Sequence, residues 1–127
     1  MKFTRPCGVL LAVALPFAVS GVASASHQTS LVLTIVTRDG ASESVTLTCQ
    51  PSGGTHPNAA SACAELRRAH GNFAALPGEP EQTICTLEYQ PLTARAAGRW
   101  RGDRVDWKHD YGNACTMHTV TGTVFLF

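Results

Sequence analysis

Cysteine and histidine are the residue types in this sequence that could support redox, metal or nucleophilic chemistry. The chain has 127 residues, with five cysteines and five histidines. The cysteines are Cys7, Cys49, Cys63, Cys85 and Cys115. None of them forms a C-x-x-C pair, and no cysteine and histidine are spaced as in a zinc knuckle, so the spacing argues against a zinc site. We therefore expect neither a metal nor a cofactor.

Hydrolytic chemistry is not indicated either. A serine hydrolase needs a nucleophile, a base and an orienting acid. The sequence has no G-x-S-x-G elbow, no H-E-x-x-H motif and no nucleotide-binding signature. His56 lies in a loop between Gly54 and Pro57, which is typical of a turn histidine that hydrogen-bonds locally and not of a catalytic base. The sequence predicts a protein that is not an enzyme.

The first 25 residues have the three-part pattern of a secretory signal peptide. Two basic residues come first, an uncharged apolar run follows, and Ala23-Ser24-Ala25 is a small-residue cleavage site. The apolar run is interrupted by Pro16 and is short for a bilayer span. We expect cleavage of residues 1–25, a secreted mature domain over residues 26–127, and no membrane segment in that domain.

Loss of the signal peptide changes both the charge and the cysteine count. Two of the ten basic residues and Cys7 leave with it, whereas all nine acidic residues remain, so the formal charge changes from +1 to −1. A charge this close to zero excludes a strongly basic nucleic-acid-binding protein. Four cysteines in a small exported domain indicate two disulfides, and three pairings remain open.

A local basic cluster surrounds Trp100. Interleaved arginine and tryptophan can bind nucleic acid, but three aspartates in the same stretch cancel much of the positive field. The residues are Arg95, Arg99, Arg101 and Arg104, with Asp103, Asp106 and Asp110. We expect a solvated hairpin with cross-strand pairs and no nucleic-acid partner.

Hydrophobic patterning predicts an α+β domain. Residues 31–37 and 44–49 are typical of an antiparallel hairpin that turns at Asp39-Gly40. A helix is predicted over residues 59–70, with Asn58 as its N-cap and Gly71 as its stop signal. Further strands are predicted over residues 92–96, 105–107 and 119–127, and the first two of these are joined by a turn near Ala97-Gly98.

The segment Thr83–Pro91 is extended by composition and lies between a Pro/Gly loop and a predicted strand. Cys85 is a disulfide candidate near its centre, and Pro91 restricts its far end. Such a segment presents alternate side chains and resembles a peptide laid as a strand into a protease cleft. The alternative is that Ile84, Leu87 and Tyr89 are core residues of a strand. Composition alone does not decide between these two interpretations.

Five blocks of the sequence together resemble the Streptomyces subtilisin inhibitor family. Each block is weak by itself, but they fall in order between residues 31 and 127 with all four mature cysteines in place. The blocks are Leu31-Val32-Leu33-Thr34, Val45-Thr46-Leu47-Thr48-Cys49, Gly54-Thr55-His56-Pro57, Ser61-Ala62-Cys63-Ala64-Glu65-Leu66 and Val124-Phe125-Leu126-Phe127. The Tyr89-x-Pro91 pair also fits the family pattern.

The resemblance implies a fold, an assembly and a function. The fold is an antiparallel five-stranded sheet with one main and one short helix, assembled as a homodimer. Its disulfides pair Cys49 with Cys63 and Cys85 with Cys115. The implied function is a secreted serine protease inhibitor, whose partners are subtilisin-like enzymes and chymotrypsin-like enzymes with an apolar slot.

The resemblance also assigns roles within the extended segment. The family's contact residue lies two positions after the third mature cysteine, so the implied reactive bond is Leu87-Glu88. Leu87 would fill the main specificity pocket and Ile84 a second apolar pocket. The remaining loop contacts would be Cys85, Thr86, Tyr89 and Pro91, with Asn113 as the residue that braces the loop.

Three positions depart from the familiar pattern. Thr86 stands where proline is frequent, Glu88 where the best-known member has an apolar residue, and Gln90 where that member has an acid. Thr86 and Glu88 therefore keep open a second hypothesis, an exported binding or structural module of the same fold without inhibitory activity.

Overall fold

A computed structural model describes residues 3, 8, 12–18, 28–79 and 84–127 of the chain. The expected cleavage site at Ala25 and Cys7 both lie outside the described residues. Residues 12–18 contain no helix or strand. No helix within the described ranges has the length and apolar character that a membrane crossing requires. Cleavage of the first 25 residues stays a prediction.

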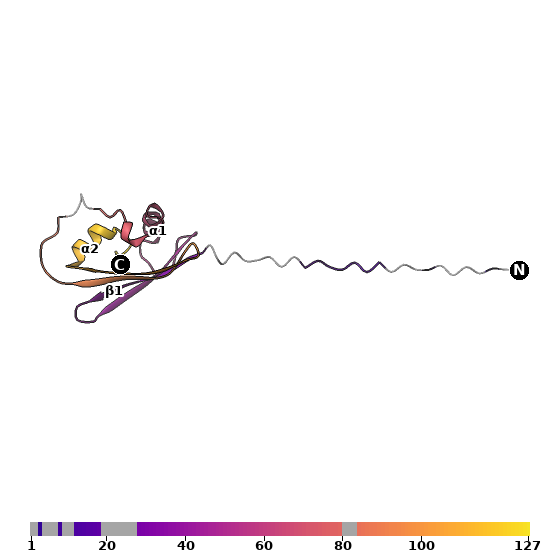
Figure 1. Ribbon diagram of the computed structural model, residues 1–127, viewed down its shortest axis with the longest axis horizontal. Coiled ribbons are helices and arrows are strands. Elements are labelled where there is room, and N and C mark those ends of the chain that lie inside the picture. The colour runs from indigo at the N-terminus through magenta and orange to yellow at the C-terminus, as the bar shows by residue number, and fades with distance from the viewer. Residues whose placement is uncertain (1–2, 4–7, 9–11, 19–27, 80–83) are drawn as a thin grey trace.

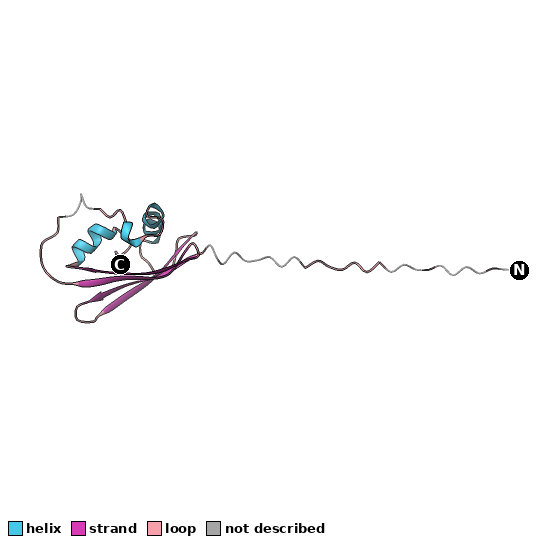
Figure 2. Cartoon of the chain, in the orientation of Figure 1, coloured by secondary structure: helices cyan, strands magenta, loops and turns pink. Residues whose placement is uncertain are grey.

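Four antiparallel strands form the sheet of the described residues (Figure 2). They are β1 (Thr29–Thr37), β2 (Ser42–Cys49), β3 (Leu92–Trp100) and β4 (Asp103–Tyr111), in the spatial order β2-β1-β3-β4. The first hairpin is confirmed, because β1 and β2 pair continuously from Thr29↔Cys49 to Val36↔Ser42. The fifth strand that the resemblance implied is not confirmed.

The prediction of a strand over residues 119–127 is wrong. The helix α2 (Ala114–Thr121) takes up the first part of this region, and no strand follows it. The Asn113 side chain accepts a hydrogen bond from the Thr116 amide and so caps the helix, while Gly122 at φ 60° ends it. Val124 and Phe125 are fully buried. Their apolar character therefore reflects packing in the core and not strand pairing.

The turn of the second hairpin also differs from its predicted place. The chain reverses at Arg101 and Gly102, both at positive φ, and not near Ala97-Gly98. Two consecutive positive φ values are the geometry that matches the strand twist in a two-residue hairpin. Gly98 instead lies inside β3, where a side chain would collide with the Ser30 carbonyl of β1. This glycine permits close strand approach and does not form a turn.

The shifted turn sets a register that places like charges opposite each other. Arg95 pairs with Lys108, and Arg99 pairs with Arg104, and all four side chains are exposed. The predicted solvated hairpin with cross-strand pairs is confirmed, but these two directly opposed pairs repel each other. Exposure to water screens the repulsion.

Within the described part of the chain, three helical elements lie on one side of the sheet (Figure 1). These are α1 (Ala59–Arg68), the short 3-10 helix η2 (Phe73–Ala75) and α2. The helix α1 ends two residues earlier than predicted, and its Asn58 side chain makes no capping hydrogen bond. Gly71 follows the helix at φ 75°, so the predicted stop signal is confirmed. A side chain at this position would collide with the Trp100 ring.

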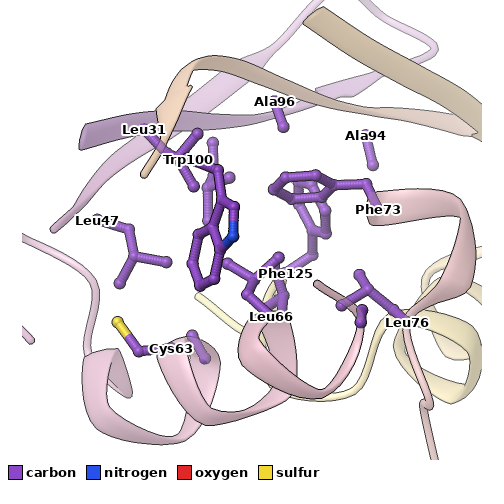
Figure 3. Packing of buried hydrophobic residues seen from close by; sticks show 14 of the residues in the cluster. Leu31, Leu47, Cys63, Leu66, Phe73, Leu76, Ala94, Ala96, Trp100 and Phe125 are labelled. Carbon is purple, nitrogen blue, oxygen red and sulfur yellow. The ribbon is translucent and has the colours of Figure 1, made fainter. Parts of the chain in front are cut away.

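The core fills the space between this side of the sheet and the helices. Figure 3 shows the Trp100 ring pointing from the sheet toward Leu66 of α1. The largest fully buried side chains come from strands, helices and the C-terminal segment alike: Phe125, Leu31, Leu33, Leu47, Leu66 and Met117. The core thus joins the first hairpin to the last residues of the chain.

His56 is a buried connection between the loop after β2 and the C-terminal segment. Its Nδ1 accepts a hydrogen bond from the Asn58 amide at 2.9 Å, and its Nε2 lies 2.9 Å from the Val124 carbonyl oxygen. A ring nitrogen that accepts from an amide carries no proton, so Nε2 is the protonated donor. The predicted local hydrogen bond is confirmed, and a second, long-range bond accompanies it.

Replacement of His56 by alanine tests this connection. We expect His56→Ala to lower the free energy of unfolding by about 2 kcal/mol, because both backbone partners lose their hydrogen bond inside the protein. The thermal midpoint should fall by roughly 10 °C for a domain of this size. His56→Asn, which retains one donor and one acceptor, should lose less. Calorimetry of the three proteins checks this, and equal midpoints would contradict it.

Candidate functional site

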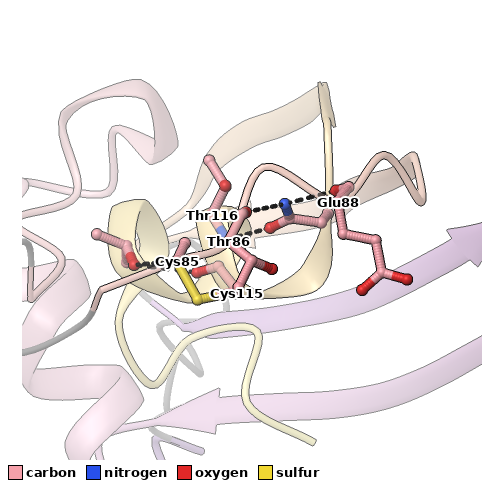
Figure 4. Close-up of a disulfide and its surroundings, with 7 residues drawn as sticks. Cys85, Thr86, Glu88, Cys115 and Thr116 are labelled. Carbon is pink, nitrogen blue, oxygen red and sulfur yellow. Dashed lines mark hydrogen bonds between the residues drawn. A yellow bond between two sulfur atoms is a disulfide. The ribbon is translucent and has the colours of Figure 1, made fainter.

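Two disulfides in the described residues link separate segments of the chain to the helices. Cys49 at the end of β2 is bonded to Cys63 of α1, and Cys85 is bonded to Cys115 in the first turn of α2. This is the pairing that the resemblance implies. The second bridge attaches the extended segment directly to a helix (Figure 4).

The segment Ile84–Pro91, called loop 84–91 below, lies outside the core. It contains no helix or strand, and β3 begins only at Leu92. Ile84 and Leu87 are fully exposed, and Tyr89 is 72% exposed. The interpretation of these three apolar residues as the core of a strand is therefore wrong. They are presented to the solvent on a chain that is anchored at Cys85.

Asn113 binds loop 84–91 on both sides of Leu87. Its Nδ2 donates to the Thr86 carbonyl oxygen at 3.1 Å and to the Glu88 carbonyl oxygen at 2.9 Å. Its Oδ1 accepts from the Thr116 amide at 2.8 Å. One side chain thus caps α2 and holds the two residues that flank Leu87.

The far end of loop 84–91 is held by backbone contacts. The Gln90 amide donates to the Gly112 carbonyl oxygen at 2.9 Å. Pro91 follows directly and restricts the backbone at the start of β3. With the disulfide at Cys85, the loop is attached at its beginning, its middle and its end.

A hydrogen bond between two side chains of the loop was not predicted from the sequence. The Gln90 Nε2 donates to the Glu88 Oε1 at 3.0 Å, and both side chains are exposed. The sequence singled out both positions as departures from the family pattern. The sequence did contain a signal for this bond, namely the spacing of two residues between Glu88 and Gln90. Side chains two residues apart in an extended chain project to the same side of the backbone and can therefore meet.

A groove lies beside the end of loop 84–91. It has a volume of about 670 Å³ and lies between Tyr89 and Pro91 of the loop and Arg38 of the turn that joins β1 to β2. In that turn, hydrogen bonds from the Thr37 hydroxyl and then the Ala41 amide lower the pKa of Asp39. The Asp39 carboxylate therefore keeps the turn bonded over the neutral pH range.

The described residues include no group of three or more histidine, cysteine, aspartate or glutamate side chains that could hold a metal ion. All four cysteines of the domain are bonded in disulfides, so no free thiolate is present in it. What the arrangement offers chemically is an exposed, extended peptide with an apolar side chain between two braced carbonyl groups.

Comparison with known proteins gives one family. The family model described as subtilisin inhibitor-like matches residues 27–113. Protease inhibitor SIL-V2 of Streptomyces orinoci is 46% identical over 103 residues, which cover 77% of this chain and 94% of the relative. The subtilase-type protease inhibitor of Streptomyces coelicolor is 38% identical over 130 residues, which cover 98% of this chain and 90% of the relative.

A solved structure is also similar. It is the crystal structure of Streptomyces caespitosus sermetstatin in complex with Bacillus licheniformis subtilisin. The superposition has a TM-score of 0.67 at 28% sequence identity and covers 79% of this chain and 99% of that chain. The match therefore extends over nearly the whole of the matched chain.

Proposed function

The chain belongs to the subtilisin inhibitor-like family, and from this premise we propose that it inhibits subtilisin-like serine proteases through the Leu87-Glu88 bond. The observation that carries the proposal is the fully exposed Leu87 between two carbonyl groups that one Asn113 side chain binds. Sermetstatin, which shares this fold, was crystallised in complex with subtilisin, and this supports the choice of partner.

The inhibitor enters the cleft as a substrate does. Leu87 fills the main specificity pocket, Ile84 a second apolar pocket three residues upstream, and the loop pairs with the enzyme as an added strand. An apolar leucine suits a subtilisin-type or chymotrypsin-type pocket and not the acidic pocket of a trypsin-like enzyme. The remaining contacts come from Cys85, Thr86, Tyr89 and Pro91, in the same loop.

Binding is tight because the loop is already ordered. The Cys85–Cys115 bridge, the Asn113 amide and the Gln90 amide hold the backbone before the protease arrives. Little conformational entropy then remains to be lost on association. The reverse reaction is favoured as well, because the two ends of a cut Leu87-Glu88 bond remain bound to the same Asn113 side chain and rejoin before they separate.

Titration of subtilisin with the oxidised, mature protein tests the proposal. We expect activity to fall linearly and to vanish at one inhibitor chain per enzyme. After long incubation, sequencing should find the chain cut slowly after Leu87. An oxidised protein that leaves both subtilisin and chymotrypsin fully active would contradict the function, and would favour the hypothesis of a binding module without inhibitory activity.

Asn113→Ala tests the brace separately from the pocket residue. We expect the inhibition constant for subtilisin to rise about tenfold and the Leu87-Glu88 bond to be hydrolysed faster, because two hydrogen bonds to the loop are lost. The matched control is Asn72→Ala. Asn72 caps η2 through the Ala74 amide at 3.0 Å, in a segment separate from loop 84–91 in the sequence. Both variants lose a cap worth about 1 kcal/mol, so equal inhibition constants would contradict the role of Asn113.

We propose in addition that the mature protein is secreted after cleavage at Ala25. The support is the signal pattern of residues 1–25 together with two disulfides, which form in oxidising compartments. N-terminal sequencing of the protein from culture medium should begin at Ser26. An intact N-terminus retained in the cell would contradict secretion.

A homodimer is proposed for the mature chain. All helical elements of the described residues lie on one side of the sheet (Figure 1), and Val32, near the middle of the other side, is about half-exposed. A second copy of the chain covers that side in the proposed dimer. Sedimentation equilibrium should give twice the mass of the mature chain, and a monomeric mass at micromolar concentration would contradict the assembly.

A further inference from the structure

The loop carries an acid directly after the proposed reactive bond, and this acid has a partner. The Glu88 Oε1 accepts a hydrogen bond from the Gln90 Nε2 at 3.0 Å. These are two of the positions at which the chain departs from its family's familiar pattern. The departures therefore occur together as one interacting pair.

The backbone on both sides of the pair is held independently of their side chains. Asn113 binds the Glu88 carbonyl oxygen, and the Gly112 carbonyl binds the Gln90 amide. Residues two apart in an extended chain project to the same side, away from the side taken by Leu87 and Tyr89. Formation of the side-chain bond thus requires only that two rotamers be ordered.

An acidic residue directly after the reactive bond is expected to weaken binding to a protease for two reasons, and the hydrogen bond between Glu88 and Gln90 can reduce both effects. When the loop enters a protease cleft, the Glu88 carboxylate loses water, and a carboxylate that is desolvated without a hydrogen bond is costly. Negative charge also develops on the scissile carbonyl oxygen of Leu87 during attack by the enzyme. A carboxylate free to approach that oxygen would oppose binding of the attacked bond.

We propose that Gln90 is a positioning residue that acts through Glu88, and this rests on the proposed function. The Gln90 amide keeps one hydrogen bond on the carboxylate as water leaves, and it holds the charge along the loop toward Pro91 and away from the bond. The pair therefore makes an acidic residue compatible with tight inhibition. This compatibility requires no change at Leu87 or in the disulfides.

A double-mutant cycle on subtilisin inhibition tests the pair, with the oxidised mature protein and its Gln90→Ala, Glu88→Ala and doubly substituted variants. We expect Gln90→Ala to raise the inhibition constant about tenfold when Glu88 is present. In the Glu88→Ala background the same substitution should change it less than twofold. Equal effects of Gln90→Ala in both backgrounds would overturn the proposal.

An exchange of the two residues gives a rescue test. Gln90→Glu alone places two acids side by side and should weaken inhibition more than tenfold. The double variant Glu88→Gln, Gln90→Glu restores one acid and one amide donor at the same spacing, and we expect its inhibition constant to return to within about threefold of the parent. No recovery in the exchanged variant would overturn the proposal.

Two readouts separate this result from other failures. The thermal midpoints of all variants should agree within about 2 °C, because both side chains are exposed; a large fall in the midpoint for Gln90→Ala would assign Gln90 a structural role instead and overturn the proposal. If the parent protein does not inhibit subtilisin, the proposed function itself fails. If the parent inhibits and the cycle shows no coupling, only the pair fails.

Discussion

Leu87→Gly should raise the inhibition constant for subtilisin about a thousandfold. Leu87 is fully exposed in the free protein, so all the apolar area that it buries is gained on binding. Loss of an anchor residue at an interface costs about 4 kcal/mol, and each 1.4 kcal/mol is a factor of ten. Glycine also loosens the loop, which adds to the loss. The thermal midpoint should fall by only a few degrees, because Leu87 is fully exposed and the added backbone entropy of glycine is the main cost to folding.

Two substitutions at the same position serve as controls. Leu87→Met keeps an apolar side chain of similar volume, although methionine lacks the branch at Cγ, and should leave inhibition of subtilisin within a few-fold of the parent. Leu87→Lys should direct the protein toward trypsin-like enzymes, whose main pocket contains an acid. If Leu87→Gly inhibits subtilisin as well as the parent does, the reactive bond lies elsewhere in the loop.

Removal of the Cys85–Cys115 bridge should have the second large effect and should convert the inhibitor into a substrate. This bridge joins residues 30 apart in the sequence, and the chain-entropy model gives about 4 kcal/mol of stability for a loop of that length. With both cysteines replaced by alanine, loop 84–91 loses its covalent attachment to α2 and keeps only hydrogen bonds such as those from Asn113. We expect these bonds alone to hold the cut ends too weakly, so that the ends separate before they rejoin. We expect subtilisin to be inhibited only briefly and to regain activity as the loop is digested.

The other bridge is the matched control for this experiment. Cys49 and Cys63 are 14 residues apart in the sequence, and their removal should cost about 3 kcal/mol by the same model. That bridge joins β2 to α1 and attaches no residue of loop 84–91. At a temperature where both variants are folded, the variant without Cys49–Cys63 should remain a lasting inhibitor. Equal loss of inhibition in both would mean that global stability, and not attachment of the loop, determines inhibition.

The parts of the fold that were predictable have strong local signals. The first hairpin follows from β-branched residues, alternation and a turn at Asp39-Gly40. The helix α1 follows from its spacing and from Gly71. The bridge partners and the role of Asn113 came only from the resemblance to a family, because four cysteines allow three pairings and an asparagine beside a turn has many uses.

The parts that were not predictable depend on contacts between distant residues. Residues 119–127 are rich in β-branched side chains, yet Asn113 starts a helix before them and core packing takes up Val124 and Phe125. Gly98 resembled a turn residue, whereas its purpose is close approach to Ser30 of another strand. In both cases tertiary packing overrides a local propensity, as is usual for β structure.

The brace described for Asn113 has a consequence for how the specificity of such a protein can change. Its amide group contacts the backbone oxygens of Thr86 and Glu88 and not their side chains. These hydrogen bonds therefore do not depend on which side chains the loop carries. Substitutions among the displayed side chains alter the choice of enzyme without a loss of folding, and a lineage that gains a new protease to control can meet it by exchanging a few exposed residues on an unchanged scaffold.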